Sequence, residues 1–329
     1  MILIFSRSND YTTFEVMKWL NHFGRSDVVR INCDEDNDIR FDIRESGFSL
    51  RVNGDDIQLN RLGAAWYRKG LNWLGGQFNE VFVEDHPELT NYLNILGCKE
   101  NQKLSEYIHY LIQQRVPVLG SAFKSDLNKL VTLDLAQSVG LKIPPFHVVN
   151  ETQSVARLLE GDQEYITKAM SDGVYLFESE NRQRGYFTYT ESVSRECIAG
   201  CPEKISPSFM QSKIEKRYEV RVFYLDGRCY SWAILSQADA QTSTDYRKYN
   251  EQKPNRVLPY KLPGAVEEQL TELFLKVGLN TGSVDLMVDS RDEHYFLEIN
   301  PVGQFGVLSR ACNYQLEAEV AKWLIEHAK

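Results

Sequence analysis

The sequence lacks three features that would assign a protein to a class at once: a long apolar run, a dense set of cysteines and repeated or low-complexity segments. The apolar run at residues 1–5 is too short for a signal peptide, and no stretch approaches the roughly 20 apolar residues of a membrane span. Six cysteines in 329 residues are too few for a disulfide scaffold. The closest pair, Cys197 and Cys201, has no second pair at zinc-binding spacing. We therefore expect a cytoplasmic protein without structural disulfides or zinc.

An excess of basic residues is also missing. The chain has 37 Lys and Arg residues against 46 Asp and Glu residues, a net charge of −9. General nucleic-acid binding and docking on an anionic membrane both need a basic surface. We therefore expect neither nucleic acid nor a membrane as a partner, while a small basic pocket for phosphate is compatible with this balance.

What is present is the composition of a folded protein, with 43% hydrophobic and 25% charged residues. Hydrophobic patterning predicts three domains of α/β and α+β class, over residues 1–120, 121–206 and 207–329. In the first domain we expect strands at 1–5, 28–32 and 63–68, a hairpin at 40–59 turning at Asn53-Gly54, and helices at 13–23 and 86–114. The second domain is expected to open with a helix over 127–139, with Asp126 as its N-cap. The third is expected to hold strands at 208–214, 219–225, 228–235, 283–289 and 295–299, and helices at 264–277 and 313–327.

Two carboxylates and one amide near the end of the chain form the strongest candidate site. Glu298 and Asn300 are two residues apart on a predicted strand, so their side chains share one face. Asp285, between two apolar neighbours on the preceding strand, can join them if the strands pair. Oxygen ligands held on strands suit a hard cation such as Mg²⁺. On spacing alone, a solvated polar sheet face is an equally good interpretation.

Two lysines could supply charge for a phosphate. Lys129 lies in the first turn of a predicted helix, and Lys168 alternates with apolar neighbours on a predicted strand. A strand lysine can place a point charge on a phosphate. Taken alone, each is more simply a surface lysine.

The segment from Gln211 to Arg221 carries groups that could bind the rest of a nucleotide. Backbone groups of Gln211 to Ile214 could hydrogen-bond an adenine. Glu219 and Arg221 share a strand face, where the carboxylate could serve a ribose and the guanidinium a phosphate.

In this order and spacing, the residues resemble the ATP-grasp superfamily of carboxylate–amine ligases. The resemblance covers about residues 121–329, with 1–120 as a preceding α/β domain. Beyond the segment 211–221 and Asp285, it is carried by the helix opening at Asn128-Lys129-Leu130 and by Leu297-Glu298-Ile299-Asn300-Pro301. It implies an ATP-grasp fold of three domains, with ATP bound between the central and C-terminal sheets.

The resemblance also implies a role for each candidate residue. ATP phosphates would be held by Lys129 and Lys168, the adenine would meet Gln211 and the backbone of Lys213 and Ile214, the ribose would meet Glu219, and Arg221 would face phosphate. Two Mg²⁺ ions would be bound by Asp285, Glu298 and Asn300, with Glu298 bridging, and these three with Arg221 would be the catalytic residues. Many family members carry a glycine-rich flap after the strand lysine, whereas residues 169–173 hold one glycine.

A closer resemblance is to the peptide-maturing branch, the graspetide synthetases, which include the microviridin ligases and the maturases of grasp-with-spasm peptides. It is carried by the segments 65–69 (Ala-Trp-Tyr-Arg-Lys), 244–249 (Thr-Asp-Tyr-Arg-Lys-Tyr) and 300–305 (Asn-Pro-Val-Gly-Gln-Phe). The second segment lies in a long polar stretch whose simpler interpretation is a solvated loop. Its Asp245, Arg247 and Lys248 stand beside two tyrosines, a set suited to gripping an acidic peptide. We expect Trp66 to Arg68 to be a core strand ending in a surface charge, or otherwise part of the substrate wall.

The resemblance implies an ATP-dependent ligase that activates Asp and Glu side-chain carboxylates of a ribosomally made precursor peptide, which carries a leader, as acyl phosphates. Attack by Ser or Thr hydroxyls, or by Lys amines, would then close ester or amide macrocycles, with esters preferred. One alternative is an ATP-grasp ligase that adds amino acids to a protein tail or joins small molecules. Another is a non-catalytic, nucleotide-gated peptide-binding protein. The family also implies a homodimer.

Overall fold

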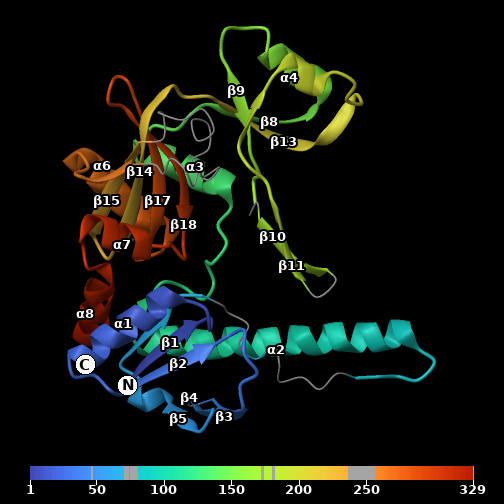
Figure 1. Ribbon diagram of the computed structural model, residues 1–329. Helices are drawn as coiled ribbons and strands as arrows, with labels where there is room; N and C mark the ends of the chain where they lie inside the picture. Colours follow the sequence, from blue (N-terminus) through green and yellow to red (C-terminus); the bar gives the residue numbers. More distant parts are fainter. Residues whose placement is uncertain are drawn as a thin grey trace. The chain divides into compact units, whose positions relative to one another are not determined.

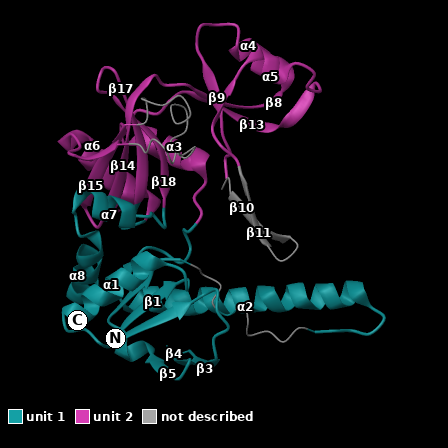
Figure 2. Ribbon diagram, viewed as in Figure 1, with its two compact units in different colours: residues 1–125, 279–282, 301–329 teal, residues 126–278, 283–300 magenta. Residues whose placement is uncertain are grey.

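The computed structural model describes residues 1–45, 47–69, 74, 81–171, 174–179, 182–235 and 256–328, with side chains in 174–187 left aside (Figure 1). The chain divides into two compact units (Figure 2). Unit 1 comprises residues 1–125, 279–282 and 301–329, and unit 2 comprises residues 126–278 and 283–300. The division into three domains stays a prediction. No helix in the described ranges is long and apolar enough to cross a membrane.

Unit 1 is built on a four-stranded sheet in the order β2-β1-β6-β7, in which every pair is parallel. Its first strand, β1, is fully buried along its apolar length, as expected for a parallel strand covered on both faces. The elements of this unit are β1 (Ile2–Ser6), α1 (Tyr11–His22), β2 (Val28–Asn32), β3 (Ile39–Arg44), β4 (Gly47–Val52), β5 (Asp55–Gln58), η1 (Leu59–Arg61), β6 (Ala64–Tyr67), α2 (Pro87–Arg115), β7 (Val118–Leu119), α7 (Gly306–Cys312) and α8 (Leu316–His327).

The strands and long helices expected here are confirmed, and three details differ. The segment 40–59 forms a three-stranded sheet, β3-β4-β5, rather than one hairpin, although its turn at Asn53-Gly54 is as predicted. Helix α1 buries Thr13, Val16 and Leu20, while Phe14 is half-exposed. Helical spacing predicts an inward face of Phe14, Met17 and Leu20, but of these only Leu20 is buried, so the prediction is confirmed for one of its three residues.

The predicted closing helix over 313–327 is two helices. Asn313 ends α7 with a left-handed φ of 54°, and Gln315 precedes α8 with a φ of 52°. A residue in that conformation cannot continue a right-handed helix, so the chain breaks there. Helical spacing predicts that Leu316, Val320, Trp323 and Leu324 of the second helix face inward, and all four are buried.

Unit 2 contains two larger sheets. A four-stranded antiparallel sheet has the order β12-β9-β13-β8, and a five-stranded sheet has the order β16-β15-β14-β17-β18. The elements are α3 (Lys129–Ser138), β8 (Phe146–Glu151), α4 (Thr152–Leu158), β9 (Tyr165–Thr167), β10 (Val174–Ser179), β11 (Arg182–Phe187), β12 (Glu191–Val193), α5 (Arg195–Ile198), β13 (Lys204–Ser212), β14 (Lys216–Leu225), β15 (Arg228–Leu235), β16 (Arg256–Tyr260), α6 (Gly264–Val277), β17 (Thr281–Asp289) and β18 (His294–Asn300).

The start of α3 corrects the predicted cap. Asn128, not Asp126, is the N-cap, and its side chain accepts hydrogen bonds from the backbone N–H groups of Leu130 and Val131. Both residue types can cap a helix, so the sequence alone leaves a choice between two positions. The observed cap makes Lys129 the first residue of the helix.

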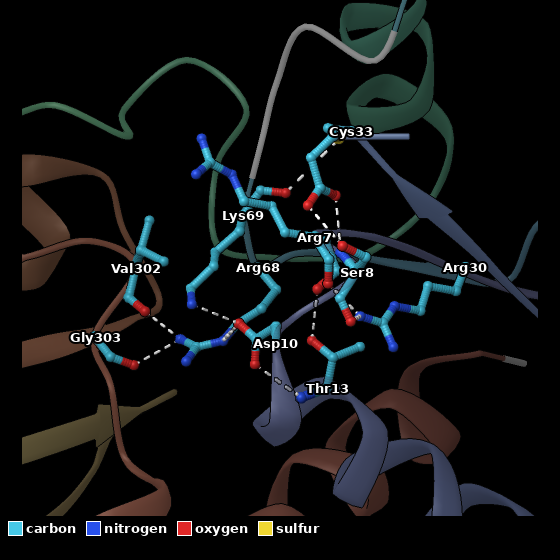
Figure 3. Close-up of polar contacts among 12 residues, drawn as sticks. Arg7, Ser8, Asp10, Thr13, Arg30, Cys33, Arg68, Lys69, Val302 and Gly303 are labelled. Atoms are coloured by element: carbon cyan, nitrogen blue, oxygen red, sulfur yellow. Dashed lines mark hydrogen bonds and ion pairs between the residues drawn. The ribbon is translucent and has the colours of Figure 1, made fainter. Parts of the chain in front are cut away.

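The end of β6 carries a buried charge where a surface charge was expected. Arg68 is only 3% exposed. Its Nε lies 3.2 Å from Oδ2 of Asp10, the N-cap of α1, and Lys69 Nζ lies 3.0 Å from the same oxygen. The Arg68 guanidinium also donates to the carbonyl oxygens of Val302 and Gly303, the latter at 2.7 Å (Figure 3). The Arg68 side chain therefore connects β6, the start of α1 and the segment that follows Asn300 in the chain.

Burial alone would raise the pKa of Asp10, but the charges of Arg68 and Lys69 and the hydrogen bonds it accepts hold that pKa below its usual range. A lowered folded pKa means that the carboxylate stabilises the fold at neutral pH. That stabilisation is lost as the pH falls through the lowered value.

We predict that Arg68→Ala destabilises the protein by about 3 kcal/mol, because it removes one partner of a buried ion pair and leaves two carbonyl groups without their donor. The midpoint of urea unfolding measures this change. Arg44→Ala is the control, since Arg44 pairs with Asp42 at the exposed surface and its loss should cost less than about 1 kcal/mol. Equal shifts for the two variants would contradict the structural role of Arg68.

Candidate active site

The five-stranded sheet of unit 2 has one face covered by a helix and one face that carries polar groups. Tyr224 of β14 stacks on Phe274 of α6, with ring centroids 4.0 Å apart. Successive side chains on a strand point to opposite faces, so Glu219 and Arg221 lie on the face away from α6. The candidate chemistry is therefore separated from the helix-covered core of the sheet.

Cross-strand register extends this polar face over the neighbouring strands. Arg221 is opposite Trp232 of β15, and Asp285 of β17 is opposite Glu298 of β18. Residues directly opposite each other share a face. Two hydrogen bonds connect the two halves of this row: Arg221 Nε donates to Asp285 Oδ1 at 2.8 Å, and Nη2 donates to Oδ2 at 3.1 Å. The row across four strands is Trp232, Arg221, Asp285 and Glu298 (strands labelled in Figure 1).

The pairing of β17 with β18 that the predicted metal site requires is present. Asn300 is opposite Ser283, two residues along each strand from the pair Glu298 and Asp285. All four side chains thus start from the same face, although the strand is irregular just after Asp285. The structure brings the three predicted ligands to one end of one sheet face.

Lys129 reaches this group from the start of α3. Its Nζ lies 3.2 Å from Glu298 Oε2 and donates to the carbonyl oxygen of Ala169 at 2.8 Å. The two carboxylates of the candidate site therefore each have a cationic partner, Lys129 for Glu298 and Arg221 for Asp285. These side chains are half-buried, which shields the pairs from water while leaving them reachable.

The donor set fits Mg²⁺ better than a metal held by protein alone. The described part of the chain contains no group of three or more His, Cys, Asp or Glu side chains that could hold a metal ion by themselves. Two carboxylates and an amide are too few for a complete protein cage. Mg²⁺ characteristically takes one or two carboxylates and completes its octahedron with phosphate oxygens and water. The set therefore fits a Mg²⁺ ion that arrives with a nucleotide.

The end of β13 is a second feature that fits the binding of a nucleotide. Gln211 is 1% exposed, and neither its amide nitrogen nor its amide oxygen has a hydrogen-bond partner within the structure as described. Buried amides are almost always paired, so both atoms are ready for a ligand or for water. The backbone N–H of Lys213, two residues after Gln211, already has a partner: it donates to the carbonyl oxygen of Glu164 at 2.8 Å. Of the predicted adenine contacts, the Gln211 side chain therefore has unused polar atoms, whereas the Lys213 N–H does not.

Lys168 and Glu219, predicted to contact phosphate and ribose, are not part of the row formed by Trp232, Arg221, Asp285 and Glu298. Lys168 follows the last residue of β9, and its Nζ lies 5.8 Å from the centre of the Phe209 ring. Glu219 forms a buried ion pair with Lys216, a residue that the sequence interpretation missed. A buried lysine on the strand start resembles any surface lysine in sequence, so only the fold reveals it.

The predicted peptide-binding residues Asp245, Arg247 and Lys248 lie outside the described residues, as do Asp172 and Gly173 of the flap segment. Their roles stay predictions.

Two further polar groups at the site were missed. Trp232 Nε1 and Ser283 Oγ are buried without a hydrogen-bond partner among the atoms described. Together with Gln211, they account for every such side-chain atom in the described part of unit 2. A signal for Trp232 was present: counting outward from a two-residue turn at Asp226-Gly227 puts it opposite Arg221.

Comparisons with known proteins show which fold the chain has. No family model and no curated protein matches the chain. Solved structures match over almost its whole length. An ATP-grasp ligase associated with ribosomally made peptides, from Chryseobacterium gregarium and in complex with ADP and a leader and core peptide, has 22% identity over 99% of this chain and 96% of that chain, with a TM-score of 0.76.

Two further solved structures, a macrocyclase and an ATP-grasp ligase, also match almost the whole chain. The macrocyclase MdnC from Microcystis aeruginosa MRC, bound with the precursor peptide MdnA, has 24% identity over 99% of both chains and a TM-score of 0.74. The ATP-grasp ligase PsnB, complexed with a minimal precursor, Mg and ADP, has 17% identity over 100% of this chain and 97% of that chain, with a TM-score of 0.76. The chain therefore has the ATP-grasp fold that its motifs predicted.

Proposed function

We propose that the protein is an ATP-dependent ligase that closes macrocycles in a ribosomally made precursor peptide. The observation that carries this proposal is the row of two ion pairs, Arg221 with Asp285 and Lys129 with Glu298, on the open face of an ATP-grasp sheet. Similar structures were solved with precursor peptides, and two of them also with ADP.

The proposed reaction starts by activating an Asp or Glu side chain of the peptide. A carboxylate oxygen attacks the γ-phosphorus of ATP, a new O–P bond forms, and ADP leaves with the electrons of the old one. A Ser or Thr hydroxyl, or a Lys amine, then attacks the acyl carbon. Phosphate leaves, the nucleophile gives up its proton, and an ester or amide link is made.

The protein groups contribute mainly charge and position. Lys129, Lys168 and Arg221 would neutralise the phosphates, because catalysis of phosphoryl transfer is largely electrostatic. Asp285, Glu298 and Asn300 would hold Mg²⁺, two ions by the resemblance, with Glu298 bridging. Mg²⁺ bound there supplies Lewis-acid stabilisation of the phosphate oxygens.

The nucleotide would lie between the two larger sheets of unit 2, with its adenine at Gln211 and Ile214 and its ribose near Glu219. The unsatisfied amide of Gln211 supports this placement. We further propose a homodimer from the resemblance, and a cytoplasmic location and the three-domain division from the sequence. Asp245, Arg247 and Lys248 would grip the peptide, whose leader would bind at a separate surface.

The proposal is tested by incubating the enzyme with ATP, Mg²⁺ and the short acidic peptide encoded beside its gene. Each ester or amide link should lower the peptide mass by one water and release one ADP. A gain in mass would instead favour a ligase that appends amino acids or joins small molecules. Peptide binding without ADP release would favour the non-catalytic alternative.

We predict that Glu298→Gln abolishes turnover, with at least a 100-fold loss of rate, while the chain still folds. The change removes the bridging charge with little change in volume. Peptide mass and ADP release measure the effect, and circular dichroism checks the fold. Glu293→Gln is the matched control, because Glu293 pairs with Lys142 at the exposed surface of the same unit. Unchanged turnover in Glu298→Gln would contradict the bridging role.

We predict that Arg247→Ala weakens use of the peptide more than use of ATP, because its guanidinium is expected to pair with acidic peptide side chains. The KM for peptide should rise about tenfold, and considerably more than the KM for ATP. Arg217→Ala, which removes an exposed arginine paired with Asp292, serves as control. Equal rises in both KM values would assign Arg247 to the nucleotide site instead.

A further inference from the structure

Trp232 presents a hydrogen-bond donor that the fold does not use. The side chain is 6% exposed, and its indole Nε1 has no hydrogen-bond partner in the described structure. The residue stands opposite Arg221, so it lies on the polar face of the sheet and not on the face that packs against α6. An unused donor is thus buried directly beside a charged residue of the candidate site.

A buried donor without an acceptor is unfavourable, and native structures pair most such groups. A phenylalanine could fill most of the same space without this cost. The indole N–H of Trp232 therefore points to an acceptor that arrives with a ligand. In the described part of unit 2, the other buried side chains with unsatisfied atoms are Ser283 on β17 and Gln211 on β13. Mg²⁺ is proposed to bind at β17 and β18, and the adenine at β13.

The order of strands indicates which ligand group reaches Trp232. Strands in a sheet are about 4.8 Å apart, so β15 lies about 10 Å from β17 and about 14 Å from β18, with Arg221 of β14 in between. The carboxylates proposed to bind the metal are Asp285 on β17 and Glu298 on β18. The phosphates that share this metal are therefore expected beside these two strands. A group beside Trp232 is on the other side of Arg221 from the metal. In a phosphoryl transfer, the acceptor lies across the transferred group from the leaving ADP.

We propose that the indole N–H of Trp232 donates a hydrogen bond to the side-chain carboxylate of the peptide residue that is being activated, which makes Trp232 a specificity-determining residue. The inference rests on the proposed function. One carboxylate oxygen accepts this hydrogen bond while the other attacks the γ-phosphorus. Trp232 keeps its proton throughout, so the step balances with only the O–P bond formed and the bond to ADP broken.

The first test removes the donor and keeps an aromatic ring. Trp232→Phe should raise the KM for the acidic peptide about 10- to 100-fold, the range for losing a hydrogen bond to a charged group. Trp19→Phe makes the same chemical change on α1 of unit 1 and should leave that KM within about twofold. A folded Trp232→Phe enzyme whose peptide KM also stays within about twofold would overturn the inference.

The second test observes the indole directly and separates a hydrogen bond from a packing effect. In protein labelled with ¹⁵N-tryptophan, the Trp232 indole proton should shift downfield when the acidic peptide is added with ADP and Mg²⁺. The peak is assigned by its loss in Trp232→Phe, or in Trp232→Tyr if the first variant does not fold. A twin peptide with Leu in place of each core Asp and Glu should not produce the shift.

The outcomes separate the two proposals. If the wild-type enzyme converts the peptide but the indole proton does not move, or moves equally with the Leu twin, only the role of Trp232 is overturned. If the wild-type enzyme never converts the peptide, the proposed function fails and the role of Trp232 fails with it.

Discussion

The bidentate ion pair between Arg221 and Asp285 is the interaction on which the candidate site depends. It joins two neighbouring strands through side chains, with both hydrogen bonds at normal length. A half-buried pair of this kind contributes only modestly to stability, because desolvation offsets much of its Coulomb energy. Its importance is in position: it holds a guanidinium and a carboxylate on one sheet face. Lys129 pairs with Glu298 on the same face, so both carboxylates of the candidate site have a cationic partner.

Much of the fold could be predicted because its signals are local. Continuous apolar strands, the turn at Asn53-Gly54 and the long periodic helices all appear in the structure. The errors arise where two local solutions are nearly equal. Asp126 and Asn128 can both cap a helix, and only packing selects the second. Asn313 and Gln315 carry no strong sign of a break, yet both adopt left-handed backbone.

The same distinction between local and non-local signals applies to the candidate site. Glu298, Asn300 and Asp285 could be identified because strand alternation and the order of motifs are properties of the sequence. Two buried cations could not be identified as buried, Lys216 on β14 and, outside the site, Arg68 in unit 1, because nothing in their sequence neighbourhood distinguishes a buried cation from a surface one. Their burial is set by partners distant in the chain or by the packing of whole strands, as Arg68 shows with Val302 and Gly303.

Register is the deeper constraint behind the ion pairs. The side-chain period of a strand is two, so a slip of one residue in β14 would turn Arg221 toward α6 and bring Val220 or Val222 to the polar face. The tight turn at Asp226-Gly227, with φ values of 43° and 88°, opposes such a slip because both residues must stay in the left-handed region. The buried stack of Tyr224 on Phe274 opposes it from the other face. The hydrophobic side of the sheet therefore determines, residue by residue, which groups the polar side can offer to a substrate.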